Sequence, residues 1–271
     1  MRYIAHTLHP MLEPHIAKIY ILEHEGSLMA PAELSSPANP CSALVLNYGD
    51  RYRLHSDFSP GTLLPPSFLA GFSSRAYRLE LTGRVGMLGV VFKGVSLRSF
   101  FSSVNLGELT DQRHDLSATI GSDAERLCSQ LAEAPTNAVR FALIETYLMR
   151  RLRLINRTQT AADLAANLML DQRGMLTMDG LADAVCVSPR HLRRLFHEQA
   201  GISPKFFARL KRFNYVHYAL TRNPMADWPD FLTNGGFYDQ SHLIKDFVEF
   251  TGKAPSVALQ RHRQLIELVK E

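Results

Sequence analysis

Hydrophobic and polar residues follow two different patterns along this 271-residue chain. Up to about residue 115 the apolar residues fall in short runs, as in SALVLNY, RAYRLEL and VGMLGVVF, and Tyr77, Leu79 and Leu81 alternate with polar neighbours. Short apolar runs between turn-forming residues predict β-strands. The turn signals that bound them are Gly49-Asp50, Pro65-Pro66 and Gly83.

From Ser122 onward the apolar residues recur with the period of an α-helix. The segments DAERLCSQLAEA, AVRFALIETYLMRRLRLI and AADLAANLML predict helices separated by short polar joints. We therefore expect an α+β chain with a β-rich domain at residues 1–115, a helical connector at 116–158 and an all-α domain at 159–271.

One pattern occurs twice in the C-terminal part. The sequence F-x-E-x-x-G-x-x-P occupies residues 196–204 and returns at 247–255, 51 positions later. The residues before it also correspond, with His191, Leu192 and Arg194 matched by His242, Leu243 and Lys245. Two copies of one small unit are therefore expected.

The first copy predicts a short, sharply bounded helix. Ser188 is a good N-cap, Pro189 suits the first helical position, and Gly201 suits a left-handed residue after the end. The preceding MDGLADA predicts another short helix, with the small Ala182 where the two helices cross. Two short helices joined by a tight turn form a helix-turn-helix pattern.

The predicted helix has a packing face and a polar face. At 100° per residue Leu192, Leu195 and Phe196 share one face. Arg190, Arg194 and His197 lie almost opposite. The second copy, DQSHLIKDFVEFTG, buries its own apolar face in the same way, after a preceding helix and turn expected at 228–237. It presents Ser241 and Lys245 at the positions of Arg190 and Arg194.

A long helix is predicted between the copies, in SPKFFARLKRFNYVHYALTRNP. Its start at Ser203-Pro204 and its end at Asn223-Pro224 leave about 20 residues, or roughly 30 Å at 1.5 Å per residue. Successive major-groove faces on one side of B-DNA lie about 34 Å apart. A rigid spacer of this length can present two recognition helices to adjacent turns.

Positive charge is concentrated in the first copy. Residues 188–223 contain eight lysines or arginines and one acid, Glu198, whereas residues 225–256 contain five acids and two lysines. Five more arginines at 140–157 are interpreted as a solvated helix face. We expect the first copy to be the stronger reader of DNA.

Candidate DNA contacts follow from this charge distribution. Arginine binds guanine O6 and N7 through two hydrogen bonds, and other cations position the protein on phosphates. The expected base-reading residues are Arg190, Arg194, His197, Ser241 and Lys245. The expected phosphate contacts are Arg193, Lys205, Arg209 and Arg212, although Arg193 and Arg209 are also compatible with plain solvation.

Residues from about 159 to 261 resemble the DNA-binding domain of the AraC/XylS family of bacterial transcription regulators. The resemblance lies in LADAVCVSPRHLRRLFHEQAGISP, in RLKRF with Arg212 at the family's helix-4 arginine, and in GFYDQSHLIKDFVEFTGKAPS. Three places depart from the family pattern, namely Phe231-Leu232, Cys186 and Val216. These departures indicate a second unit set at a slightly different angle.

The resemblance implies a sequence-specific regulator, either activator or repressor, that binds double-stranded DNA. It also implies that the N-terminal half is an effector or dimerisation domain with a jelly-roll-like barrel. The expected partners are DNA, a small-molecule effector, a second copy of the chain and RNA polymerase. Two alternatives stay open, namely an enzyme or sensor barrel that is only localised by the tandem unit, and an architectural DNA-binding protein.

The first 115 residues show no nucleophile, acid-base pair, phosphate loop or metal-binding cluster, so we expect no enzyme, cofactor or metal. Cys41, Cys128 and Cys186 are interpreted as ordinary core or turn residues. No apolar run approaches a membrane span and no signal peptide is recognisable, so a cytoplasmic location is expected.

Two further sets of residues leave alternatives open. His55, Arg75 and Tyr77 interrupt strands and are candidate effector contacts, although such residues are also common on barrel surfaces. Phe141, Ile144, Leu148 and Leu152 form a helical stripe that would pair either with a second copy of the chain or with the chain's own barrel.

Overall fold

The computed structural model describes residues 1–155, 159–222, 232 and 235–259. Its N-terminal part folds into one antiparallel sheet of eight strands. The strands are β1 (Arg2–His6), β2 (Ile16–Ser36), β3 (Ala43–Asn47), β4 (Arg53–Ser56), β5 (Ser59–Leu63), β6 (Ser67–Ala70), β7 (Tyr77–Phe92) and β8 (Arg113–Asp115). The β-rich character predicted for residues 1–115 is confirmed.

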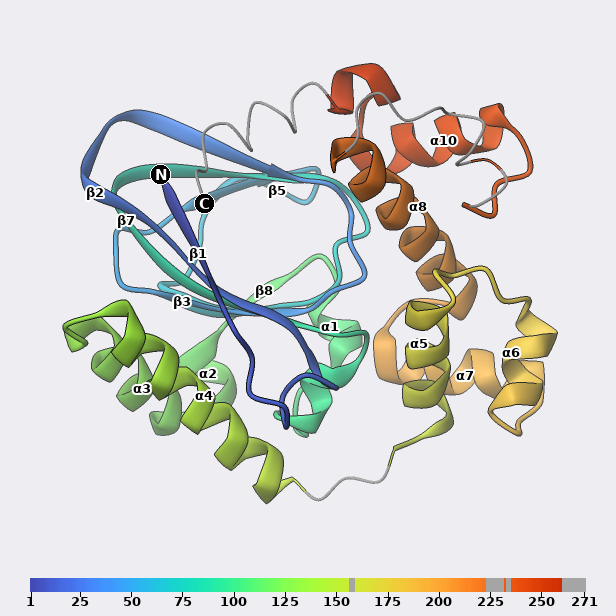
Figure 1. Ribbon diagram of the computed structural model, residues 1–271, viewed down its shortest axis with the longest axis horizontal. Helices are drawn as coiled ribbons and strands as arrows, with labels where there is room; N and C mark the ends of the chain where they lie inside the picture. Colours follow the sequence, from blue (N-terminus) through green and yellow to red (C-terminus); the bar gives the residue numbers. More distant parts are fainter. Residues whose placement is uncertain (156–158, 223–231, 233–234, 260–271) are drawn as a thin grey trace.

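The sheet is organised around the two long strands β2 and β7, which pair from Ile16↔Phe92 to Ser36↔Tyr77. The first part of β7 pairs with β4 and its last part with β3, so the sheet branches and curls. Figure 1 shows the strands as a ring seen nearly end-on. The predicted strand boundary at Gly83 is wrong, because β7 continues through it with a positive φ of 64° opposite a bulged part of β2.

The alternation along the strands separates two apolar cores. On β2 and β7, Ile21 and Leu88 belong to the cluster that packs against the helices. Leu22 and Met87, one position away on each strand, belong with Tyr52 to the other cluster. One face of the curled sheet is thus covered by helices, and the other face packs upon itself.

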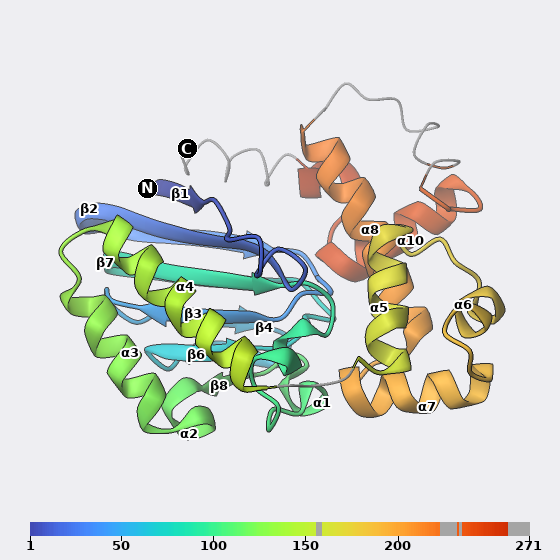
Figure 2. The same ribbon diagram turned by 60° about the horizontal axis from the view of Figure 1, so that its bottom comes forward.

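Three helices cover the outer face, as Figure 2 shows for α3 and α4. They are α2 (Leu116–Ile120), α3 (Ser122–Glu133) and α4 (Asn137–Leu154), preceded by a 3₁₀ turn (Ser96–Ser99) and the short α1 (Leu106–Leu109). Ile144 and Leu148 of α4 are fully buried and Phe141 nearly so. The stripe therefore packs on the chain's own barrel and is not free to pair with a second copy.

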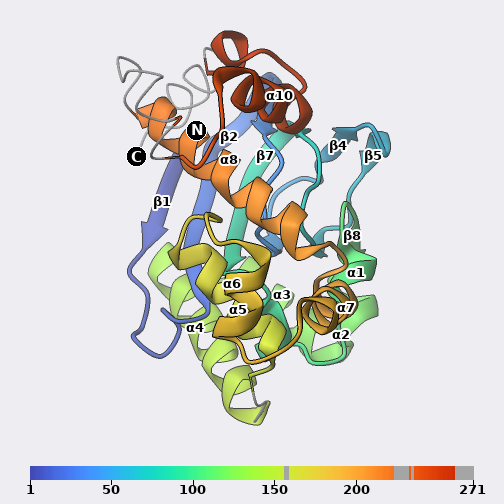
Figure 3. The ribbon, with the colours of Figure 1, turned by 90° about the vertical axis from the view of Figure 1, so that its right-hand side faces the viewer.

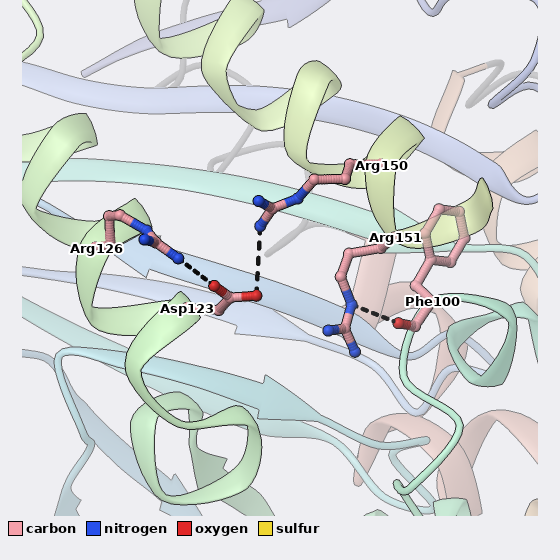
Figure 4. Close-up of polar contacts among 5 residues, drawn as sticks. All are labelled: Phe100, Asp123, Arg126, Arg150 and Arg151. Atoms are coloured by element: carbon pink, nitrogen blue, oxygen red, sulfur yellow. Dashed lines mark hydrogen bonds and ion pairs between the residues drawn. The ribbon is translucent and has the colours of Figure 1, made fainter. Parts of the chain in front are cut away.

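Two arginines of α4, Arg150 and Arg151, tie this helix to its surroundings, whereas Arg153 is exposed, as the sequence predicted. Figure 4 shows Arg150 bound to Asp123 of α3 at 3.3 Å, and the Arg151 Nε donating to the Phe100 carbonyl at 2.9 Å. Asp123 also pairs with Arg126. The connector is thus held to the barrel by polar contacts as well as by its apolar stripe.

The C-terminal part is helical in every element that the structure describes. Its helices are α5 (Ala161–Asp171), α6 (Met178–Ala184), α7 (Pro189–Ala200), α8 (Pro204–Arg222) and α10 (Gln240–Thr251). Their bounds confirm the helices predicted from the sequence. The helix and turn expected at 228–237 and the stop at Asn223-Pro224 lie mostly outside the described residues.

The long helix α8 connects the two units. Figure 3 shows α7 near one end of α8 and α10 near the other. Phe207 and Ala208 of α8 pack in the cluster of the first unit, and Leu210 and Phe213 in the cluster of the second. α8 is therefore apolar on two sides and belongs to both units.

At one point the backbone of the barrel side contacts the backbone of the helical part directly, with no side chain between them. Gly107 of α1 meets Gly201 after α7 so closely that a Cβ on Gly201 would lie 2.2 Å from the Gly107 Cα. Phe72 contacts Phe207 with ring centroids 5.7 Å apart. At the second unit, the Ala38 N–H donates to the Phe250 carbonyl at 2.9 Å.

Within the described residues, none of the helices combines the length and apolar composition needed to cross a lipid bilayer.

Candidate nucleic-acid interface

The first helix-turn-helix consists of α6 and α7, and its boundaries are fixed by side-chain caps. The Thr177 and Ser188 hydroxyls accept hydrogen bonds from the N–H groups of Gly180 and His191 at 3.1 and 3.2 Å. Gly201 ends α7 in a left-handed conformation, with φ of 73°. These caps confirm the helix limits predicted from the sequence.

The turn between α6 and α7 contains an unusual residue. Cys186 adopts a left-handed conformation with φ of 54°, although it has a side chain. The sequence singled out this position because glycine is common there in the family, and the backbone gives the physical reason. Cys186 is exposed and free, so its side chain adds no packing that would offset the strain.

The two faces of α7 are those that the sequence predicted. Leu192 and Phe196 are buried against the rest of the unit. Arg190, Arg194 and His197 are exposed on the other side. The described structure thus gathers the predicted readers of the first copy on one accessible helix face, and their contacts with bases remain predictions.

Arg194 is already oriented along this face. Its Nη1 donates to the Glu198 carboxylate at 2.9 Å, and its Nη2 lies 3.2 Å from the His191 Nδ1. The side chains of Arg194 and Glu198 are 60% and 51% exposed. Ion pairs in such positions stabilise by about 1 kcal/mol or less, so Arg194 can exchange Glu198 for a base edge at little cost.

The second recognition helix, α10, has the same construction. The Asp239 carboxylate caps it by accepting from the His242 N–H at 2.7 Å, and Gly252 ends it with φ of 71°. Leu243, Phe247 and Phe250 are fully buried. Ser241 and Lys245 are exposed, as the sequence predicted.

The structure argues against the phosphate contact predicted for Arg209. Its Nη2 lies 2.6 Å from the Asp246 carboxylate and 2.7 Å from that of Glu249, both on α10. Although burial opposes the charged form, the hydrogen bonds to these two acids outweigh it and raise the pKa of Arg209. Arg209 is therefore a brace between α8 and α10, because its charge is already matched within the protein.

The brace accounts for two of the five acids counted at residues 225–256. Asp246 is only 1% exposed and faces Arg209, which also binds Glu249. Asp239 is occupied as the N-cap. Of the acids that the structure describes in this segment, Asp246 is buried, Glu249 is partly exposed but paired with Arg209, and Asp239 is exposed at the N-cap; Asp227 and Asp230 lie outside the described residues.

Arg212 is half-buried and also serves packing. Its guanidinium lies over the Phe237 ring, 5.8 Å from the centroid, and its side chain passes close to Gly174. Burial lowers the pKa of Arg212. Arg193 and Lys205 are exposed, so they are better placed than Arg212 to reach phosphates, and all three assignments remain predictions.

The structure brings the three candidate effector residues to one cavity. This junction cavity, of about 530 Å³, is lined by His55, Arg75 and Tyr77 from the barrel and by His217 and Val248 from the helical part. His55 is paired with Glu80 at 2.8 Å. Sequence reasoning missed the contribution of His217 and Val248, because nothing local indicates that residues so distant in the chain border the same space.

Two family models match the chain, one to each part. Residues 6–115 match a domain of unknown function (DUF6597), and residues 181–261 match a helix-turn-helix domain. The second match spans both recognition helices and the helix between them. The C-terminal part of this chain is a helix-turn-helix domain, and the chain is similar to arabinose operon regulatory proteins. The predicted resemblance is thereby confirmed for this part.

The curated relatives each match only part of this chain. The arabinose operon regulatory protein of Salmonella typhimurium is 30% identical over 125 residues, which cover 42% of this chain and 43% of the relative. The bifunctional transcriptional activator/DNA repair enzyme Ada of Escherichia coli is 31% identical over 84 residues, covering 31% of this chain and 23% of Ada. The chain thus spans less than half the length of these relatives.

Among solved structures, ToxT from Vibrio cholerae aligns with 87% of this chain and 98% of its own, at 11% identity and a TM-score of 0.46.

Proposed function

We propose that this chain is a sequence-specific, DNA-binding transcription regulator that uses α7 and α10 to read one operator in adjacent major grooves. The observation that carries the proposal is the exposed cationic face of α7, which lies opposite a fully buried apolar face within a helix-turn-helix domain. α8 spans about 28 Å by its 19 residues at 1.5 Å each, which suits adjacent turns of B-DNA.

The residues have different roles in this proposal. Arg190, Arg194 and His197 read base edges in one half of the operator, and Ser241 and Lys245 in the other. Arg193 and Lys205 bind phosphates. Arg212 supports the domain by packing over Phe237. Arg209 holds α10 through its ion pairs with Asp246 and Glu249.

The barrel regulates DNA binding through the junction in this proposal. An effector in the junction cavity would touch Val248 at the end of α10 as well as His55 and Arg75 of the barrel. A ligand there can change DNA affinity only through a different affinity for two arrangements of these parts. We assign no enzymatic activity, since the family model that matches residues 181–261 is that of a helix-turn-helix domain.

The test is selection of DNA from a random duplex library by the full chain, followed by titrations on the selected operator and a scrambled duplex. Arg194→Ala should weaken operator binding by about 1–3 kcal/mol and relax base preference in one half, and Lys245→Ala should cost less. Arg2→Ala is the matched control, because Arg2 is 73% exposed on β1, far from the helix-turn-helix units.

Three outcomes separate the alternatives. The proposal is supported if a defined operator is recovered and Arg194→Ala discriminates less well than the wild type between this operator and the scrambled duplex. Equal affinity for operator and scrambled DNA would indicate an architectural protein. If Arg2→Ala weakened binding as much as Arg194→Ala, the assignment of the reading face would be wrong.

A further inference from the structure

A second cavity lies on the barrel, away from α7 and α10. It has a volume of about 620 Å³ and is bordered by β1, β2 and β7 and by the facing ends of α3 and α4. Figure 2 shows these ends of α3 and α4 on the side of the barrel opposite the helical part. We call this cavity the distal cleft, and its charged lining residues are Arg2, Glu23, Glu25, Arg84 and Arg140.

Tyr48 brings two of these arginines together. The Arg140 guanidinium of α4 lies over the Tyr48 ring, 4.4 Å from its centroid. The Arg84 Nη2 of β7 donates to the Tyr48 carbonyl at 3.0 Å. Burial and the neighbouring Glu23 raise the pKa of Tyr48 to about 12, so its hydroxyl stays protonated. Tyr48 therefore offers no negative charge to either arginine.

Neither guanidinium has a carboxylate partner among the residues that the structure describes. Arg140 donates from Nε to the Leu131 carbonyl at 3.1 Å and from Nη1 to the Asn137 amide oxygen at 2.9 Å. The Asp50 carboxylate accepts from the backbone N–H of Arg84, at 2.7 Å, rather than from its guanidinium. Both side chains are thus positioned by neutral acceptors, which leaves their charges available to an anion from outside the chain.

The two glutamates of the distal cleft do not supply that anion. Glu23 accepts from the Asn137 Nδ2 at 3.1 Å on both carboxylate oxygens, and its Oε1 lies 4.0 Å from the Arg2 guanidinium. Glu25 is exposed to solvent. Three arginines and two glutamates leave the lining with a net charge of +1.

A carboxylate or a phosphate matches the free donors, since a guanidinium binds such groups through two parallel hydrogen bonds. Val85 and Ala132 add an apolar part to the lining, and the volume is that of a small-molecule site. We propose that the distal cleft binds a small organic anion, whose carboxylate or phosphate group lies between the Arg84 and Arg140 guanidiniums. This site is separate from the junction cavity, and it does not depend on the proposed function.

Isothermal titration calorimetry of the full chain tests the inference with benzoate and phenyl phosphate as anionic probes. Benzamide is the uncharged control, because it has nearly the shape of benzoate. At least one anion should bind, and benzamide should bind about tenfold more weakly or not at all, since hydrogen bonds to charged groups are the stronger ones. The anion that binds more tightly distinguishes a carboxylate site from a phosphate site.

Protein variants locate the bound anion. Arg84→Gln should weaken anion binding by about tenfold or more without changing the melting temperature, because Arg84 is exposed. Arg140→Gln should weaken it as much, but it also removes the contacts that join α3 to α4. Arg53→Gln is the matched control, because Arg53 is exposed outside the distal cleft and also donates to a carbonyl, that of Gly61 at 3.1 Å. Arg75→Gln tests whether the anion enters the junction cavity instead.

The inference is supported if Arg84→Gln weakens anion binding while Arg53→Gln and Arg75→Gln retain it. Absence of binding by the wild type at millimolar concentrations of both anions would overturn it. Retention of full affinity in Arg84→Gln, or an equal loss in Arg53→Gln, would overturn it as well. Loss in Arg75→Gln alone would assign the anion to the junction cavity, which would refute the distal cleft and leave the proposed function in place.

Discussion

Replacing Arg209 by alanine should destabilise the protein more than replacing any exposed arginine of the same domain. The change leaves Asp246, which is 1% exposed, without the guanidinium that lies 2.6 Å away. Removing one partner of a buried ion pair typically costs about 3–5 kcal/mol. Because the Arg209 side chain is itself 26% exposed, water can enter the vacated space, and we expect about 2–3 kcal/mol.

Urea unfolding of the full chain, followed by circular dichroism, measures this effect. Arg193→Ala is the matched control, because it removes an exposed arginine of the first unit and should change the free energy of unfolding by about 0.5 kcal/mol or less. Arg209→Met should also lower the free energy of unfolding, because it leaves the Asp246 charge uncompensated. Adding Asp246→Asn to Arg209→Met should recover part of that free energy, because it removes this charge.

The result that would refute this reasoning is also defined. If Arg209→Ala were as stable as Arg193→Ala, and if it flattened the dependence of log K on log salt by about 0.9, Arg209 would be a phosphate contact. The sequence-based assignment would then be correct and the brace between α8 and α10 would have no energetic role.

Three further changes test other parts of the structure. Cys186→Gly should raise the free energy of unfolding by about 0.5–1 kcal/mol by relieving the left-handed strain at φ 54°, and a lower melting midpoint would contradict this. Gly201→Ala should cost about 2 kcal/mol or more, because its Cβ would lie 2.2 Å from the Gly107 Cα; faster proteolysis between the barrel and α5 would report the loosened junction, and unchanged cleavage would oppose it. Lys205→Ala should reduce the salt slope of DNA binding by about 0.9 with the same preferred sequence, and an altered preference in operator titrations would show that Lys205 reads bases.

Local signals in the sequence were sufficient for the helices of the DNA-binding domain. Ser188 acts through its own hydroxyl, and Pro189 and Gly201 act through their own backbones, so the limits of α7 follow from the residues themselves. The barrel was less accessible to such reasoning. Gly83 looked like the end of a strand, and only its pairing partner in β2 shows that the chain continues in the same ladder.

The same limit explains what was missed in the candidate site. The charge of Arg209 suggested DNA, whereas its role depends on Asp246 and Glu249, which come from another helix. The stripe of α4 could be recognised, but not the surface that covers it. Two residues that meet only in the folded protein leave no pattern in either of their local sequences. Contacts between separate helices and strands therefore could not be predicted from the sequence and required the structure.

The shared packing between the barrel and the helices bears on how the protein can be divided experimentally. Ala38 of the barrel belongs to the apolar cluster of the second unit, and Phe72 covers Phe207 of α8. A recombinant fragment that starts near residue 159 would expose Phe207 to water and leave the Phe250 carbonyl without the Ala38 N–H. Chimeras that attach this DNA-binding domain to another sensor would meet the same difficulty, and would need the new sensor to supply an equivalent aromatic cover and a glycine facing Gly201.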